Sequence, residues 1–343
     1  MAKRIIVMTG PTAVGKTKHS IEIAEKLNGE IVSADSMQIY KYMDIGSAKP
    51  DKEELARVRH HLVGEIDPGL PFSVASYRKL AKSAIADIFA RKKQPIIAGG
   101  TGLYINSLIY DMDFSSPPVD NGYRRELEEL ARMEGNECVH KRLAEKDAAA
   151  AERIHPNNLR KMIRALEVAE NSENRIKSFE NSFVKTEDYG TCLICLTRNR
   201  EELYDRINKR VDLLIKQGLI GEVQSLLNRG LGFGDISMKG IGYKEIIRHF
   251  SGEFEVSEAV SIIKRNTRRY AKRQLTWFRR YEDMKWFNLS EYEREPECKP
   301  GPESVFRGAF GNIENNDKNN VTTNENNDKK MINDILAWIH KDG

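Results

Sequence analysis

An octapeptide near the start of the chain has residue types suited to holding phosphate groups. Residues 10–17 read GPTAVGKT and follow the apolar run RIIVM. Glycines let a loop turn amide N–H groups toward one point, and the helix expected after it favours an anion at its N-terminus. Lys16 supplies a positive charge for a phosphate, and the Thr17 hydroxyl is a ligand for Mg²⁺. The residues predicted to bind phosphates are Gly10, Pro11, Thr12, Ala13, Val14, Gly15, Lys16 and Thr17.

One acidic residue is well placed to act beside this loop. Asp35 ends the segment GEIVSADS, which has the pattern of a buried strand. The segment PIIAGGTG ends in glycines and a threonine, where a P-loop NTPase usually has the Asp that helps to hold Mg²⁺. Asp35 is therefore interpreted as a metal ligand or a general base, with helix capping as the structural alternative.

A segment in the second half of the chain is basic and aromatic. Residues 263–281 read IKRNTRRYAKRQLTWFRRY, with no acid between Lys264 and Arg280. Its cations come in pairs every four residues, so a helix would present them as one stripe that suits a phosphate backbone better than a solvated face does. The pairs are Lys264, Arg265, Arg268, Arg269, Lys272 and Arg273. Arg160, Lys161 and Arg164 form a second, smaller stripe. Together the two surfaces predict a bound nucleic acid.

The elements that must position these residues alternate between strands and helices. RIIVMTG, GEIVSAD, HHLVGEI and PIIAGG read as short buried strands, with helical patterns between them. This alternation predicts an α/β fold with a parallel sheet covered on both faces and a ligand site at the carboxyl ends of its strands. Charged helical segments follow up to about residue 185, and TCLICLT then resumes the sheet. The expected domains are a core of residues 1–115 and 190–300, a helical insertion of residues 116–189, an Asn-rich disordered linker of residues 301–330, and an amphipathic helix of residues 331–343.

Composition limits the class of protein. The chain has 343 residues and a net charge of +4, and no apolar stretch approaches the ~18 residues that a membrane span requires. The N-terminal apolar run is too short for a signal peptide, so a cytoplasmic location is expected. Cys192 and Cys195 lie three residues apart on an expected strand and face opposite sides, which predicts buried thiols and neither a shared metal nor a disulfide.

Three functions fit these residues. A phosphate cradle, a candidate base and two basic surfaces suit a transferase that moves a group from a diphosphate donor onto RNA. A P-loop kinase of a nucleotide or small metabolite is the alternative, although the usual magnesium-binding Asp is missing. A non-catalytic RNA-binding module with a relic loop is the third, and the intact Lys16, Thr17 and Asp35 count against it.

Six motifs together resemble the bacterial tRNA dimethylallyltransferases (tRNA isopentenyltransferases). They are GPTAVGKT, SADSMQIYKYMDIGSAKP, PIIAGGTGLYI, HPNN with RALEV, GIGYKE and TRRYAKRQLTWFR, and the resemblance extends from about residue 5 to residue 290. It implies a P-loop NTPase-like core with a parallel sheet and an all-helical insertion. It also implies transfer of a dimethylallyl group from dimethylallyl diphosphate to N6 of the adenosine on the 3′ side of the anticodon. The loop would then bind the diphosphate of the donor and not ATP.

The resemblance also implies roles for single residues. Asp35 matches the family's catalytic base, Thr101 matches a residue that orients the target amine, and Arg210 matches an arginine that binds the diphosphate together with Mg²⁺. The target adenine is expected to flip out of its stack. The expected partners are dimethylallyl diphosphate and the anticodon stem-loop of tRNA, without a membrane, and the expected state is a monomer.

The tRNA contacts come from the same resemblance and from the basic segment. The residues expected to contact tRNA are Asp35, Ser36, Met37, Gln38, Thr101, Arg124, Arg160, Lys161, Met162, Ile163, Arg164, Arg268, Arg269, Lys272 and Arg273. Met37 departs from the family's usual arginine, which removes a polar contact but leaves a side chain able to pack on a base. Asn158 in HPNN, where HPND is common, and Lys161, where Arg is usual, preserve the capping role and the charge.

Overall fold

The computed structural model describes residues 3–112, 121–171, 184–293 and 316–341, and it divides into two compact units. Residues 1–108 and 187–343 belong to unit 1, and residues 109–186 belong to unit 2. The inserted unit thus begins seven residues earlier and ends three residues earlier than the expected boundaries of 116 and 189. No helix of the described ranges is both long enough and apolar enough to cross a membrane.

Unit 1 is built on a six-stranded sheet in which all neighbouring strands run parallel, as the alternation of strands and helices predicted. The strands follow the spatial order β3-β2-β4-β1-β5-β6. Their bounds are β1 Arg4–Thr9, β2 Gly29–Ser33, β3 His60–His61, β4 Gln94–Ala98, β5 Gly190–Thr197 and β6 Lys285–Asn288. Because β1 pairs with β5 along the whole length of β1, residues on both sides of the insertion form one sheet.

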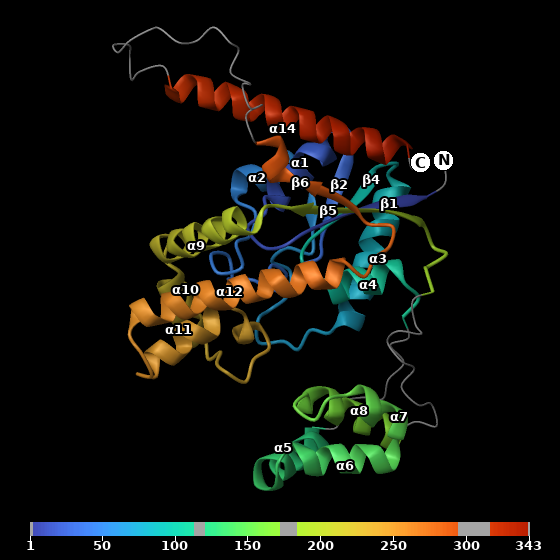
Figure 1. The fold of residues 1–343 in the computed structure, drawn as a ribbon, viewed down its shortest axis with the longest axis vertical. Coiled ribbons are helices and arrows are strands. Elements are labelled where there is room, and N and C mark those ends of the chain that lie inside the picture. Colours follow the sequence, from blue (N-terminus) through green and yellow to red (C-terminus); the bar gives the residue numbers. More distant parts are fainter. Residues whose placement is uncertain (1–2, 113–120, 172–183, 294–315, 342–343) are drawn as a thin grey trace, which may run out of the picture. The chain divides into compact units, whose positions relative to one another are not determined.

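Helices cover both faces of this sheet. Figure 1 shows α1 and α14 on one face, and α3, α4 and α12 on the other. The helices of unit 1 are α1 Lys16–Lys26, α2 Lys52–Arg57, α3 Val74–Ala90, α4 Gly102–Ile109, α9 Arg200–Lys216, α10 Leu219–Asn228, the short 3₁₀ helix Ser237–Lys239, α11 Tyr243–Phe250, α12 Val256–Phe278, α13 Leu289–Tyr292 and α14 Asn316–Lys341. Cys192 and Cys195 are buried on β5, as the strand pattern of their segment predicted.

The C-terminal helix α14 begins earlier than the sequence predicts. It extends from Asn316 to Lys341, so residues 316–330 are helical where a disordered linker was expected; the rest of that linker lies outside the described residues. Met331, Ile332, Ile335 and Ile339 pack into the same core as Ile21 of α1. Once this docked part is helical, each further residue adds one hydrogen bond without a new nucleation cost, which favours extension through an Asn-rich sequence.

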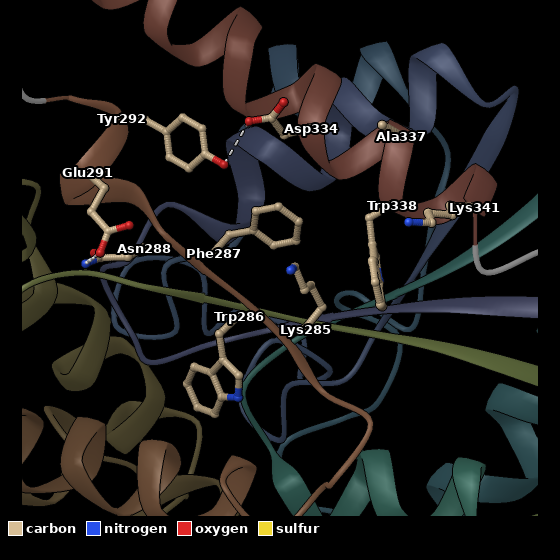
Figure 2. Close-up of a pocket in the computed structure, with 10 residues that line it drawn as sticks. All are labelled: Lys285, Trp286, Phe287, Asn288, Glu291, Tyr292, Asp334, Ala337, Trp338 and Lys341. Atoms are coloured by element: carbon tan, nitrogen blue, oxygen red, sulfur yellow. Dashed lines mark hydrogen bonds between the residues drawn. The ribbon is translucent and has the colours of Figure 1, made fainter. Parts of the chain in front are cut away.

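A surface pocket of about 400 Å³ lies between β6 and α13 on one side and α14 on the other. Figure 2 shows the Tyr292 hydroxyl donating to Asp334 of α14 (3.0 Å), and Lys285 and Trp338 facing each other, with the Lys285 ammonium 5.1 Å from the centre of the ring. None of the residues predicted to form the functional site lines this pocket.

Unit 2 is entirely helical apart from one β-bridge between Tyr110 and Lys185, in the part of it that the structure describes. Its helices are α5 Asn121–Glu134, α6 Asn136–Lys146, α7 Ala148–Arg153 and α8 Leu159–Asn171. Leu127, Val139, Leu143 and Leu166 are fully buried in its own hydrophobic core. The segment therefore folds around a core of its own.

Candidate active site

The loop predicted to bind phosphates, called the phosphate-binding loop below, lies between β1 and α1, as its sequence predicted. Gly10 (φ +149°) has its backbone against β5, where an added Cβ would lie 2.4 Å from the carbonyl oxygen of Leu196. Ala13 (φ +64°) and Gly15 (φ +111°) also adopt left-handed conformations. Such conformations let successive amide N–H groups point to one side of a loop, which makes a cradle for anions.

Three cations hold the carbonyl groups of this loop. Lys16 Nζ donates to the carbonyls of Gly10 (3.0 Å) and Pro11 (2.8 Å). Arg206 donates to the carbonyl of Ala13 (3.1 Å), and Arg198 donates to that of Val14 (3.1 Å). The buried Arg198 is itself held by carboxylates of Glu293 and Glu202. With the carbonyls held in this way, the loop keeps its shape.

Burial gives Lys16 an unusual pKa. Removal from water, and secondarily the charge on Arg210, lowers the pKa of Lys16 from 10.5 to about 8, while Asp35 partly offsets this effect. Burial also lowers the pKa of Arg210 from its ordinary value, and Asp35 again acts in the opposite direction. The two cations and this carboxylate therefore share one electrostatic environment.

Asp35 and Thr101 lie on adjacent loops that follow β2 and β4. The Asp35 carboxylate accepts the backbone N–H groups of Met37 (2.9 Å) and Gln38 (3.3 Å). The Thr101 hydroxyl oxygen accepts the N–H of Ser36 (3.0 Å), and the Thr101 N–H donates to the Ala34 carbonyl (3.0 Å). The loops are therefore joined directly beside Asp35.

A cavity of about 410 Å³ joins the phosphate-binding loop to this carboxylate. Thr12, Asp35 and Arg210 all line it. Three further cations line it, Lys239, Lys244 and Arg273, together with apolar and aromatic side chains, which are Tyr40, Phe72, Tyr104, Ile207, Val211, Leu214, Leu219, Ile236, Ile241, Ile263 and Tyr270. A small adjoining cavity of about 40 Å³ is lined by Lys16, Thr17 and again Asp35. The site thus brings together the loop, a carboxylate shared by both cavities, and a larger cavity with apolar, aromatic and cationic walls.

The residues after Asp35 have different surroundings. Ser36 and Met37 line the large cavity, and Met37 packs so closely against Gly240 that a Cβ there would lie 2.5 Å from its methyl carbon. Gln38 lines the small cavity, and its amide donates to the carbonyl of Ala48 (3.1 Å). Gln38 therefore braces the loop around Ala48, a role that the sequence did not indicate.

The basic segment forms α12, but its cations do not make one uniform stripe. Lys264 pairs with Asp212 of α9 (2.7 Å), and Arg268 donates to Asn208 of α9 (2.6 Å). Arg269 and Lys272 are exposed, and Arg273 is exposed while also lining the large cavity. Of the six paired cations, Arg265, Arg269, Lys272 and Arg273 are exposed, whereas Lys264 and Arg268 are engaged with α9.

Two of the predicted tRNA contacts of unit 2 bond to the same buried acid. Glu167 accepts hydrogen bonds from both Arg124 (2.9 Å) and Arg164 (3.0 Å), so these two arginines are held in place. Met162 and Ile163, which are also predicted to contact tRNA, have their side chains buried in the core of the unit. They face inward because apolar residues recur at helical spacing along α8, whereas Arg160 and Lys161 are exposed.

Two positioning groups were missed from the sequence. Glu222 of α10 accepts the N–H groups of Asp44 (2.7 Å), Ile45 (2.7 Å) and Gly46 (2.9 Å), and the Tyr243 hydroxyl (2.7 Å). Gln274 of α12 contacts two loops of the site. The available signal for Gln274 is that it lies four residues after Tyr270 and four before the apolar Phe278, on the inward face of the helix.

Comparisons with known proteins agree with this arrangement. A family model described as "IPP transferase" matches residues 38–281. The tRNA dimethylallyltransferase of Alkaliphilus oremlandii is 52% identical over 316 residues, which cover 91% of this chain and 100% of the relative. The tRNA dimethylallyltransferase of Clostridioides difficile is 50% identical over 295 residues, which cover 86% and 94%.

Solved structures show the same likeness. The full-length tRNA isopentenylpyrophosphate transferase of Bacillus halodurans has a TM-score of 0.63 at 43% identity, and the match covers 83% of this chain and 90% of that one. A eukaryotic dimethylallyltransferase acting on tRNA has a TM-score of 0.72 at 27% identity, covering 85% and 76%. The sheet and loops described above are thus those of a P-loop NTPase-like fold, and the chain belongs to the IPP transferase family.

Proposed function

We propose that this chain is a tRNA dimethylallyltransferase that acts on N6 of the adenosine on the 3′ side of the anticodon, with dimethylallyl diphosphate as donor. The observation that carries the proposal is the cavity in which the phosphate-binding loop, Asp35 and Arg210 meet. The relatives' names support the tRNA substrate and the transferred group. A kinase is not favoured, because the relatives are prenyl transferases.

The reaction assigns one task to each group. The N6 lone pair forms a bond to C1 of the dimethylallyl group, and the bond from C1 to the diphosphate oxygen breaks with its electron pair leaving on the diphosphate. The proton released from N6 passes to the Asp35 carboxylate, because an exocyclic adenine amine becomes acidic as it is alkylated. Lys16, Arg210 and the loop N–H groups stabilise the negative charge on the leaving diphosphate.

A magnesium ion fits the residues at the phosphate end. Thr17 and Asp35 line the small cavity, and their oxygen atoms are the ligand type that Mg²⁺ prefers. Within the described residues there is no cluster of three or more His, Cys, Asp or Glu side chains that would hold a metal alone, so diphosphate and water oxygens would complete the shell. When bound, the ion neutralises part of the diphosphate charge. We assign Thr17 as its ligand from the protein.

The target base must leave its stack to reach this cavity. Asp35 lies among buried strand ends, where a base within an RNA helix or stacked loop cannot approach. The exposed cations of α12 and the Arg160–Lys161 pair of α8 are proposed to bind the tRNA backbone. We further propose that the enzyme acts as a monomer in the cytoplasm, and sedimentation with and without tRNA tests the monomer.

The experiment combines the protein with Mg²⁺, unmodified bulk tRNA and isotope-labelled dimethylallyl diphosphate, with a parallel reaction containing labelled ATP. After nuclease digestion, mass spectrometry looks for N6-dimethylallyladenosine. Label in that nucleoside with ATP intact supports the proposal. ATP turnover without labelled nucleoside contradicts it and identifies the loop as a nucleotide site.

A further inference from the structure

Gln274 of α12 is a buried polar side chain that joins two loops of the site. Only 5% of the residue is exposed. Its Oε1 accepts the backbone N–H of Thr12 (2.9 Å), and its Nε2 donates to the carbonyl of Gly100 (2.9 Å). A backbone N–H can only donate and a carbonyl can only accept, so the amide of Gln274 has one orientation that satisfies both partners.

The two loops follow neighbouring strands, and their backbones pack closely around the side-chain amide of Gln274. Thr12 belongs to the phosphate-binding loop after β1, and Gly100 belongs to the loop after β4, its parallel neighbour. An added Cβ at Gly100 would lie 2.2 Å from Nε2 of Gln274, and one at Gly99 would lie 2.3 Å from the carbonyl oxygen of Ala34. The β4 loop is therefore pressed between α12 and the residue that precedes Asp35.

This contact continues toward the candidate base. Thr101 adjoins Gly100 and is bonded to Ala34 and Ser36, the residues on either side of Asp35. Tyr270, one helical turn before Gln274, lines the large cavity and interacts with both Thr101 and Gln274. A continuous set of hydrogen bonds thus runs from the phosphate-binding loop, through Gln274, to the loop of Asp35.

We infer that Gln274 is a positioning residue of the transfer reaction, which fixes the distance between the bound diphosphate and the target amine. The inference rests on the proposed function. Displacement at C1 requires the leaving oxygen, the carbon and N6 to lie nearly in line. One loop holds the leaving group, while Asp35 and Thr101 hold the amine, so a shift between the loops misaligns the reacting atoms. A misplacement of ~1 Å costs on the order of 10²-fold in rate.

The first test uses Gln274→Glu and Gln274→Ala. At neutral pH the Glu carboxylate accepts from Thr12 but cannot donate to Gly100, and Ala makes neither bond. We expect kcat at saturating substrates to fall by roughly 10- to 100-fold in both variants, with the Kd for tRNA unchanged. Thr276→Ala, at an exposed position on the same helix, should retain wild-type kcat and is the matched control.

The pH profile separates positioning from a general structural defect. A protonated Glu can donate to the Gly100 carbonyl, so the ratio of Gln274→Glu to wild-type kcat should rise as the pH is lowered. The corresponding ratio for Gln274→Ala should stay flat. Thermal unfolding of each variant, with assays kept below its Tm, ensures that folded protein is compared.

The second test uses the crowding at Gly100. Gly100→Ala alone should slow turnover, because its Cβ displaces the Gln274 amide. In the double variant with Gln274→Ala that clash disappears, and the nearest remaining atom is the Gly10 carbonyl oxygen at 3.6 Å, an ordinary contact. The double variant should therefore be no slower than Gln274→Ala alone.

The inference is overturned if Gln274→Glu and Gln274→Ala both retain wild-type kcat. It is also overturned if the kcat losses of Gly100→Ala and Gln274→Ala multiply in the double variant. A flat pH ratio for Gln274→Glu also overturns it. These failures differ from failure of the proposed function, in which the wild-type enzyme itself forms no N6-dimethylallyladenosine.

Discussion

At the residue scale, the chemistry of the site depends on one carboxylate surrounded by backbone amides. Asn at position 35 keeps an oxygen that can accept the N–H groups of Met37 and Gln38, so the loop should retain its shape. Asp35→Asn removes only the capacity to take a proton, which makes it a cleaner test than truncation.

We expect Asp35→Asn to lower the single-turnover rate by about 10²- to 10⁴-fold, the usual contribution of a general base. The Kd for tRNA in filter binding should be unchanged. Glu53→Gln, an exposed acid of α2, serves as the control for loss of one negative charge. Wild-type turnover in Asp35→Asn would remove Asp35 from the role of base.

The lowered pKa of Lys16 gives a second prediction. Below about pH 8 the ammonium is charged and attracts the diphosphate, and as the pH rises through this value the charge is lost. The KM for dimethylallyl diphosphate should therefore increase above about pH 8, while kcat at saturating donor is less affected because bound diphosphate favours the charged ammonium. Lys16→Arg stays charged, so its KM should not show this increase. Parallel KM profiles for the two proteins would contradict the assignment.

Sequence alone predicted that the glycine-rich loop of residues 10–17 and Asp35 lie at the ends of strands, because each follows a recognisable buried strand. It could not predict the role of Gln274, because its partners are a backbone N–H of Thr12 and a backbone carbonyl of Gly100. Every residue type has such a carbonyl and nearly every one has such an N–H, so the sequence gives no sign of the contact. Met162 and Ile163 were assigned to tRNA from a matching segment, although the helical period of α8 already turns them inward.

At the element scale, α12 has one side against α9 and another exposed to solvent. Lys264 and Arg268 satisfy polar groups of α9, so they are poor candidates for RNA contacts, and the exposed Arg269 and Lys272 are better ones. The sequence showed the spacing of these cations but not which neighbour would cover two of them, because Asp212 and Asn208 lie more than fifty residues away. The sequence also did not predict β6, because its four residues KWFN form a short strand at the edge of the sheet.

We expect Arg269→Gln combined with Lys272→Gln to weaken tRNA binding and to reduce the slope of log K against log salt by roughly 1.5. The control combines Lys26→Gln with Lys52→Gln, which removes two exposed cations from α1 and α2. Binding isotherms from low to high salt measure the slope. An unchanged slope with slower turnover would exclude α12 as a tRNA-binding surface.

At the scale of the whole molecule, the C-terminal helix contributes to the core beside the phosphate-binding loop. α14 packs on α1, the helix that carries Lys16 and Thr17. Ile335 is completely buried in this contact. The sequence predicted an amphipathic helix at residues 331–343, but it could not show which face of the sheet this helix covers.

Ile335→Ala should lower the free energy of unfolding by about 2–4 kcal/mol, the usual cost of truncating a buried isoleucine. Denaturant titration measures this change, and Asn333→Ala, at an exposed position of α14, should leave stability nearly unchanged. Equal stability of the two variants would show that α14 does not pack on α1.

The insertion has a consequence for synthesis of the protein on the ribosome. β1 has β4 on one side and β5 on the other, and the whole stretch from Ala98 to Gly190 must be translated before β5 emerges. At ~5–20 residues per second this leaves one edge of β1 without its partner for on the order of ten seconds. During that interval the nascent chain presents an apolar strand edge that nascent-chain chaperones would have to shield.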